Sequence, residues 1–141
     1  MRFLAYLFAL SLIAGQALAQ PAPFSGVVTS VSDGDTLVVM RGSAPVRVRL
    51  AWVDAPERGQ DYGYFAKRAL AELCFMRLAR VDPVDVDGYG RVVARVACDG
   101  KDAGLHLLRN GLAWAFLRHN PPREYLQEQG RAQNERAGLW R

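Results

Sequence analysis

Two tight-turn sequences constrain the fold of this chain more than any other feature. The first, Asp33-Gly34, separates the strand-like run Phe24 to Ser32 from a second run, Thr36 to Met40. Asp-Gly between two β-branched runs is a strong hairpin signal, because both residues tolerate the backbone angles of a tight turn. After a further turn at Gly42 to Pro45, residues Val46 to Val53 alternate at period two before becoming wholly apolar, which predicts a third strand with one buried face.

The second turn, Asp87-Gly88-Tyr89-Gly90, predicts another hairpin, formed by Ala79 to Val86 and Arg91 to Ala97. Apolar side chains recur at helical spacing from Tyr62 to Leu78, so we expect a helix between the two hairpins. In that helix one apolar stripe contains Phe65, Ala69, Leu73 and Met76, and Ala66, Leu70 and Cys74 lie beside it. Two further helices are expected at Lys101 to Asn110 and after Pro121-Pro122, the last fading toward Gly138.

Five strands with hairpins at both ends of the sheet, plus about three helices, predict an α+β, mainly β fold. The architecture that fits is a small, partly closed antiparallel barrel of the OB type, with the helices packed on it. Residues 20–141 have the length of one ordinary domain, and half of all residues are apolar, which is enough for a proper core. The formal net charge of +4 is compatible with a polyanionic partner, but many solvated surfaces are equally basic.

The first nineteen residues have the organisation of a cleavable signal peptide. Met1-Arg2 is a short positive start, Phe3 to Ala14 is nearly unbroken apolar sequence, and Ala17-Leu18-Ala19 ends it with small residues. A membrane anchor is disfavoured, because the apolar run is shorter than the ~20 residues that span a bilayer. We expect cleavage after Ala19 and export to the periplasm or the medium, with no membrane contact afterwards.

The two cysteines, Cys74 and Cys98, both follow the predicted cleavage site. Thiols in an oxidising compartment tend to pair. Cys98 ends one strand of the second hairpin and lies opposite the start of the other strand, where the helix carrying Cys74 ends. A Cys74–Cys98 disulfide is therefore predicted, with two buried free thiols as the alternative.

Three clusters of polar residues stand out: Asp33-Gly34-Asp35-Thr36, the segment Arg49 to Glu57, and Asp87 to Arg91. Taken singly, each is an ordinary turn or strand end, because Asp bonds its own backbone in turns and Gly tolerates positive φ. Taken together, they contain the parts that phosphodiester cleavage needs: fixed positive groups around the phosphate, a positioned water and a base.

The oxygen atoms in these clusters predict a site for a hard divalent cation. Asp35 and Asp54 offer two carboxylates, and the carbonyl of Ala55 is a third oxygen, turned outward because a residue before proline prefers an extended backbone. No Cys or His lies within the clusters, which favours Ca²⁺ or Mg²⁺ over Zn²⁺ or Cu²⁺. With two carboxylates only, we expect weak Ca²⁺ binding, on the order of 10⁻⁴–10⁻³ M.

The remaining side chains have the chemistry of a phosphate site. Arg49 and Arg91 can each hold phosphate oxygens with two parallel hydrogen bonds, and Glu57 can orient or deprotonate the attacking water. Arg49 and Asp54 are five residues apart, so an ideal strand would place them on opposite faces. For both side chains to reach one site, a bulge or the turn at Ala55-Pro56 has to shift this alternation of faces, which we call the parity of the chain.

In this order, the motifs DGDT, RLAWVDAPE, DGYGR, NGLAW and the closing GLW resemble the staphylococcal nuclease family, in particular its exported bacterial members. The resemblance runs from about Phe24 to Trp140. It implies an OB-type barrel and Ca²⁺-dependent hydrolysis of DNA and RNA, cutting at the 5′-oxygen to leave 3′-phosphate ends. We expect the protein to be a monomer. Residue by residue, the resemblance assigns Asp35, Asp54 and the Ala55 carbonyl to the metal, Arg49 and Arg91 to the phosphate, and Glu57 to the general base.

The chain departs from the family pattern around the nucleotide. Gly88 stands where a well-known member has a lysine, whereas Tyr89 retains the neighbouring aromatic ring. A second pocket tyrosine has no clear counterpart, and Phe116 and Leu117 are the nearest residues, of which Phe116 is the candidate for substrate binding. The competing function is a non-catalytic OB module that binds single-stranded nucleic acid, but carboxylates facing a polyanion would weaken such binding unless a cation intervened.

Overall fold

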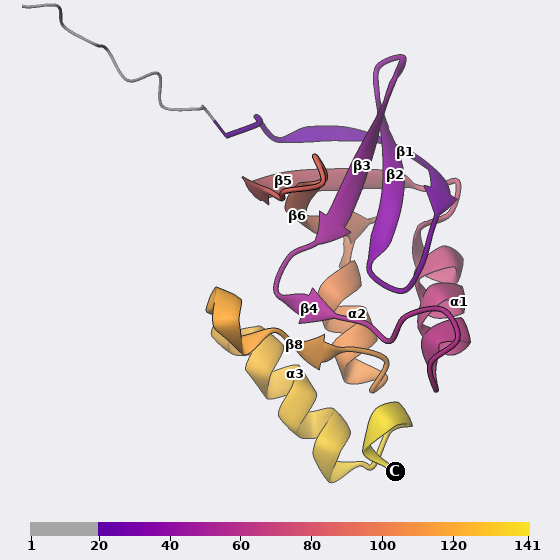
Figure 1. Ribbon diagram of the computed structural model, residues 1–141, viewed down its shortest axis with the longest axis vertical. Helices are drawn as coiled ribbons and strands as arrows, with labels where there is room; N and C mark the ends of the chain where they lie inside the picture. Colours follow the sequence, from indigo (N-terminus) through magenta and orange to yellow (C-terminus); the bar gives the residue numbers. More distant parts are fainter. Residues whose placement is uncertain (1–19) are drawn as a thin grey trace, which may run out of the picture.

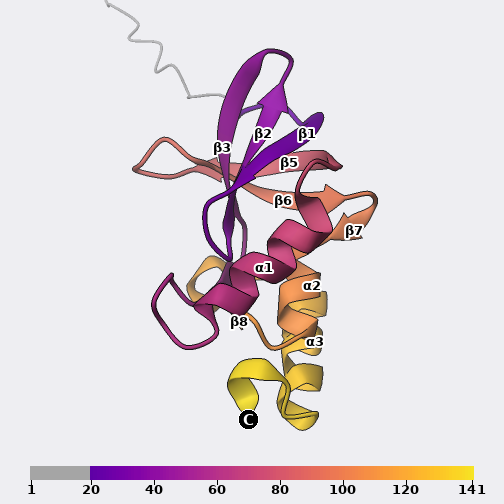
Figure 2. The same ribbon diagram turned by 90° about the vertical axis from the view of Figure 1, so that its right-hand side faces the viewer.

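The computed structural model describes residues 20–141, and the predicted signal peptide, residues 1–19, lies outside them. Figures 1 and 2 show a β-barrel at one end of the molecule and helices α2 and α3 at the other, with α1 along the side. None of the helices in residues 20–141 combines the length and apolar character needed to cross a bilayer. The barrel strands are β1 (Phe24–Val31), β2 (Thr36–Arg41), β3 (Ala44–Leu50), β5 (Leu78–Val86) and β6 (Val92–Cys98).

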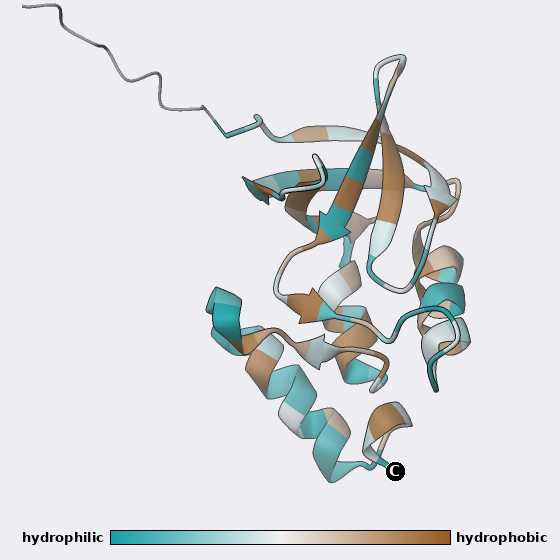
Figure 3. Ribbon diagram, viewed as in Figure 1, coloured by the Kyte–Doolittle hydropathy of each residue, from teal (hydrophilic) through white to brown (hydrophobic). Residues whose placement is uncertain are grey.

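The five-stranded barrel predicted from the sequence is confirmed. The strands follow the order β3-β2-β1-β5-β6, and an additional pairing of β3 with β6 closes the sheet. That closing pair is parallel, with Val48 opposite Val92, so the barrel is mixed, whereas the other barrel pairs are antiparallel. Figure 3 shows alternating hydrophobic and hydrophilic bands along β3, as period-two alternation requires.

Helices and short strands cover one end of the barrel. The helices are α1 (Gly63–Cys74), α2 (Ala103–Arg109) and α3 (Arg123–Asn134), with 3-10 turns η1 (Leu117–His119) and η2 (Gly138–Trp140). The short strands are β7 (Lys101–Asp102), which extends the sheet beyond β6, and β4 (Val53–Asp54), which pairs with β8 (Trp114–Ala115). A single core runs from the barrel interior to the helices; its largest fully buried side chains include Leu37, Leu50, Leu70, Leu107, Leu108 and Tyr125.

Of the two neighbouring apolar stripes in the sequence, helix α1 buries the one that contains Ala66, Leu70 and Cys74. The buried residues of α1 are Gly63, Ala66, Leu70 and Cys74, whereas the Phe65 side chain is 56% exposed. Gly63 lies against the Glu57 carbonyl in the segment before α1, and Ala66 lies against Gly34 in the turn before β2, so a ring at either position would hold the helix away. The helix also ends four residues earlier than expected, at Cys74.

The predicted disulfide is present, and the Cα atoms of Cys74 and Cys98 lie 5.2 Å apart. Ala79, near the start of β5, is the register partner of Cys98, so the last residue of α1 meets the last residue of β6 as the sequence indicated. Both cysteines are fully buried, and the bond therefore joins α1 to the barrel from inside the core.

The strand expected from Val46 to Val53 is broken in two. Strand β3 ends at Leu50, Ala51 and Trp52 form a turn, and Trp52 has a left-handed φ of 64°. The Trp52 ring packs edge-on against Tyr125, with ring centroids 5.5 Å apart, so its side chain is held by the core. This turn changes the parity of the chain between β3 and β4, at a point earlier than Ala55-Pro56.

Candidate active site

A pocket of about 430 Å³ gathers residues from all three polar clusters at the mouth of the barrel. It is formed by the turn before β2, the end of β3, the segment from β4 to α1, and the residue just before β6. A larger hollow of about 740 Å³ lies between α1, α2 and η2, but it contains no residue of those three clusters. The chemistry therefore places the site in the smaller pocket. Its lining residues are Ser32, Asp33, Asp35, Arg49, Asp54, Ala55, Pro56, Glu57, Arg58 and Arg91.

Asp35 is held rigidly at the base of this pocket. Its Oδ2 accepts a hydrogen bond from the Ala55 backbone N–H (3.1 Å), and its Oδ1 accepts one from Thr36 Oγ1 (3.0 Å). Gly34 makes this position possible, because a Cβ there would lie 2.7 Å from the Cβ atoms of both Ala55 and Ala66. Burial raises the pKa of Asp35 to about 6, although the Ala55 hydrogen bond and the nearby Arg49 charge oppose the rise.

Arg49 lies between the two carboxylates predicted to bind metal. Its Nη2 is 3.6 Å from Asp35 Oδ2 and 3.5 Å from Asp54 Oδ1, while its Nη1 donates to the Leu50 carbonyl (3.0 Å). The turn at Ala51-Trp52 brings Asp54 to the same side as Arg49, which an unbroken strand would not do. The three side chains therefore converge on one point.

Arg91 reaches the pocket from the turn just before β6. Its Nε donates to Asp87 Oδ2 (2.7 Å), and its Nη1 donates to Thr36 Oγ1 (3.3 Å). Asp87 also accepts the backbone N–H groups of Tyr89 and Arg91 on Oδ1, at 2.9 and 3.0 Å. Burial alone would raise the pKa of Asp87, but these hydrogen bonds lower it below its ordinary value.

Thr36 and Asp87 are positioning residues to which the sequence patterns assigned no role. Thr36 Oγ1 connects Asp35 to Arg91, and Asp87 fixes the guanidinium of Arg91. Both lie in the turn motifs themselves, so their positions were visible in the sequence. Their partners were not, because Thr36 and Arg91 are 55 residues apart along the chain.

Glu57 is exposed on the segment between β4 and α1, with its carboxylate free of hydrogen bonds to the described residues. Its backbone is fixed on both sides: Glu57 N donates to Gln60 Oε1 (2.7 Å), and Gln60 N donates to Glu57 O (3.0 Å). Gly63 allows α1 to approach this segment, because a Cβ there would collide with the Glu57 carbonyl oxygen. Arg58 anchors the same segment by donating to the Ser32 carbonyl (3.1 Å).

Two aromatic rings lie against the two arginines. The Arg49 guanidinium carbon is 5.9 Å from the centre of the Phe116 ring, and that of Arg91 is 5.4 Å from the Tyr89 ring. Tyr89 is 81% exposed, whereas Phe116 is partly buried and contacts His119, with ring centroids 4.5 Å apart. Neither ring lines the pocket itself, so both residues border the site rather than form it.

The oxygen atoms of the pocket fit a hard cation. Asp35 and Asp54 converge on the same atom of Arg49, and Ala55 follows directly in the chain. Within residues 20–141, no group of three or more His, Cys, Asp and Glu side chains gathers around one point. A cation bound by the two carboxylates would therefore need backbone oxygen and water to complete its coordination shell.

Comparison with known proteins identifies the family. Residues 47–141 match the family model described as staphylococcal nuclease homologue. A Shigella flexneri protein named micrococcal nuclease is 37% identical over 133 residues, which cover 84% of this chain and 75% of that protein. A Haemophilus influenzae protein named uncharacterized endonuclease is 36% identical over 114 residues, which cover 80% of this chain and 64% of that protein.

The similarity reaches beyond the part of the chain that the family model matches. Protein ParB of Escherichia coli is 35% identical over 152 aligned positions, covering 99% of this chain and 86% of that protein. The chain spans slightly less than two thirds of the Haemophilus influenzae protein. The family model covers the pocket residues from Arg49 to Arg91, and the chain belongs to the staphylococcal nuclease homologue family.

Proposed function

We propose that this protein is an exported, Ca²⁺-dependent nuclease that hydrolyses phosphodiester bonds of DNA and RNA. Family membership and nuclease-named relatives support a hydrolase of the endonuclease type. The single observation that carries the finer proposal is the convergence of two arginines, two carboxylates and Glu57 on one pocket. A protein that only binds nucleic acid gains nothing from three carboxylates facing a polyanion.

Arg49 and Arg91 would bind the non-bridging oxygens of the scissile phosphate. Both side chains are largely buried, at 16% and 19% exposed, and both guanidinium groups are fixed by hydrogen bonds before substrate arrives. Preorganised donors of this kind stabilise the extra negative charge that develops on a five-coordinate phosphorus. A Ca²⁺ held by Asp35, Asp54 and the Ala55 carbonyl would add positive charge next to the same oxygens.

Glu57 would act as the general base. Its carboxylate takes a proton from water, and the resulting hydroxide forms a bond to phosphorus while the bond from phosphorus to the 5′-oxygen breaks. The leaving 5′-oxygen then takes a proton from solvent, which produces a 5′-hydroxyl end and a 3′-phosphate end. The exposure of Glu57 suits this role, because water reaches its carboxylate directly.

The experiment is cleavage of single-stranded DNA and of RNA, with Ca²⁺, with Mg²⁺ and with chelator. The variants Glu57→Gln and Arg91→Ala should each lower kcat by about 10²-fold or more. The melting temperature of Glu57→Gln should equal that of the wild-type protein. Glu135→Gln is the matched control, because Glu135 is exposed beyond α3 and lines none of the pockets described here. Mapping of the products should find 3′-phosphate ends.

Each alternative result has a definite meaning. Full activity of Glu57→Gln would remove Glu57 from the mechanism, and products with 3′-hydroxyl ends alone would overturn the direction of cleavage. Activity that persists with chelator would contradict the metal site. Tight binding of single-stranded DNA without cleavage in any divalent metal would support the competing function, a non-catalytic binding module.

A further inference from the structure

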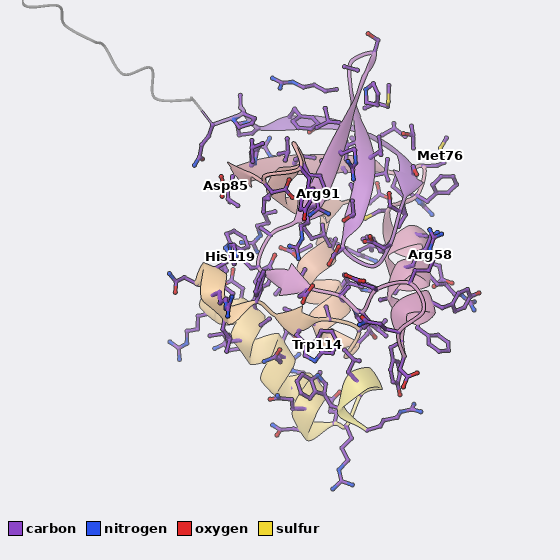
Figure 4. All side chains as sticks on the ribbon, in the orientation of Figure 1. Arg58, Met76, Asp85, Arg91, Trp114 and His119 are labelled. Carbon is purple, nitrogen blue, oxygen red and sulfur yellow. A yellow bond between two sulfur atoms is a disulfide. The ribbon has the colours of Figure 1, made fainter. Side chains whose placement is uncertain are left out.

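A second hollow of about 350 Å³ adjoins the active-site pocket on its α1 side, and the two share Asp33 and Arg58. Its other lining residues, Gly59, Gly63, Tyr64, Lys67, Arg68 and Ala71, come from the segment before α1 and from α1 itself. In the view of Figure 4, Arg58 lies on the α1 side of the molecule and His119 on the opposite side. The mechanism proposed above uses no residue of this second hollow.

The side chains around this hollow combine positive charge with aromatic surface. Lys67 forms no ion pair within residues 20–141, and Arg58 is bound there through a neutral carbonyl alone. Arg68 pairs with Glu72 (2.8 Å), which offsets its charge, and Asp33 is the single acid in the lining. Tyr64 is 69% exposed, and its ring is steadied by an edge-on contact with Phe65 (ring centroids 5.7 Å apart).

This combination matches the chemistry of a single-stranded polynucleotide. Proteins that bind such strands use a positive groove along the phosphates and aromatic rings on which bases stack. Burial in the core does not explain Tyr64, because α1 packs on the barrel through Gly63, Ala66, Leu70 and Cys74 instead. The hollow shares Asp33 and Arg58 with the pocket that would hold the scissile phosphate, so a strand that leaves this pocket past Arg58 reaches Lys67 and Tyr64 next.

We propose that the hollow at Arg58, Tyr64 and Lys67 is an extended substrate subsite, which binds the single-stranded nucleic acid flanking the scissile phosphate. Lys67 and Arg58 contact its phosphates, and Tyr64 stacks on one of its bases. This inference rests on the proposed nuclease function, and it adds a length requirement to that function. A strand that reaches the subsite binds more tightly than a dinucleotide, which occupies only the active-site pocket.

The test compares Tyr64→Ala and Lys67→Ala with the parent protein in a Glu57→Gln background, where bound DNA stays intact. Fluorescence anisotropy measures the Kd of a labelled oligothymidylate of about ten nucleotides, a length within the range of known single-strand sites. Loss of one stacked base in Tyr64→Ala should raise this Kd about tenfold. Lys67→Ala should reduce the slope of log Kd against log salt by about 0.7, because one phosphate contact is lost.

The other lysine of the sequence, Lys101, is the matched control, because it is exposed in β7 and lines none of the pockets described here. Lys101→Ala should leave both the Kd and the salt slope unchanged. With Glu57 intact, Tyr64→Ala should also lower the ratio of kcat/KM for the oligonucleotide to kcat/KM for thymidylyl-thymidine. A drop that is equal for both substrates would indicate damage to the active site and overturn the subsite.

The result separates this inference from the nuclease proposal. If the protein cleaves DNA but the Tyr64 and Lys67 variants bind the oligonucleotide as tightly as the parent, the subsite is refuted and the nuclease function stands. If no cleavage occurs but both variants lose affinity as predicted, the nuclease proposal fails and the binding surface remains. Affinity loss of equal size in Lys101→Ala would refute the subsite, because general surface charge would then account for binding.

Discussion

Reduction of the Cys74–Cys98 disulfide should destabilise the protein by a predictable amount. The bond closes a loop with a sequence separation of 24, for which the loss of unfolded-chain entropy corresponds to about 3.5 kcal/mol at 25 °C. Both sulfur atoms belong to fully buried residues, so reduction leaves the core filled and tests the cross-link without creating a cavity. For a domain of this size, the loss corresponds to a decrease in Tm of about 10–15 °C.

The measurement is thermal unfolding of the oxidised protein and of the protein after unfolding, reduction and refolding with reductant present. Nuclease activity at low temperature should be the same in both forms, because neither cysteine lines the active-site pocket. The Cys74→Ala/Cys98→Ala variant is the control, and reductant should not change its Tm. A Tm that falls by less than about 3 °C on reduction of the wild-type protein would refute the cross-link argument.

Two further predictions concern the ion pair between Asp87 and Arg91 and the cleavage of the signal peptide. Asp87→Asn should lower the free energy of unfolding at pH 7 by about 2 kcal/mol, because it removes a charge-assisted hydrogen bond to Arg91, and it should lower kcat about tenfold. The folded-state pKa of Asp87 is lowered, so the ionised carboxylate stabilises the folded protein at pH values above the unfolded-state pKa of Asp87. This stabilisation is lost as the pH falls through the folded-state pKa of Asp87. Urea unfolding should therefore show a smaller difference between wild type and Asp87→Asn at pH 3 than at pH 7; an equal difference would contradict the ion pair. For the exported protein, Edman sequencing should start at Gln20, and a start at Met1 would refute cleavage after Ala19.

Local patterns in the sequence predicted most of the secondary structure. The Asp33-Gly34 and Asp87-Gly90 turns connect antiparallel strands as expected, and β6 alternates buried and partly exposed residues along its length. Turn chemistry and period-two alternation act within a few residues, so they can be recognised without knowledge of distant parts. The disulfide was predictable for a related reason, because hairpin register places Cys98 opposite the start of β5.

Two local patterns were ambiguous for the same reason. Phe65 and Met76 are both large and apolar at helical spacing, yet they are 56% and 62% exposed. The run from Val46 to Val53 is apolar throughout its second half, yet it contains a turn at Trp52. Each pattern allowed two local solutions, and distant parts of the chain selected one of them: the barrel surface selects the small-residue face of α1, and Tyr125 packs against Trp52.

The sequence by itself determined the residue types at the site, because carboxylates, arginines and turn glycines are the chemistry that a phosphate and a hard cation require. The tertiary structure alone decided their arrangement. Arg49 and Asp54 meet because the turn at Trp52 changes the parity of the chain, and Thr36 joins Asp35 to Arg91 across a sequence distance of 55 residues. Such contacts depend on barrel closure by the parallel pairing of β3 and β6, and strand pairing at that distance leaves no periodic pattern in the sequence.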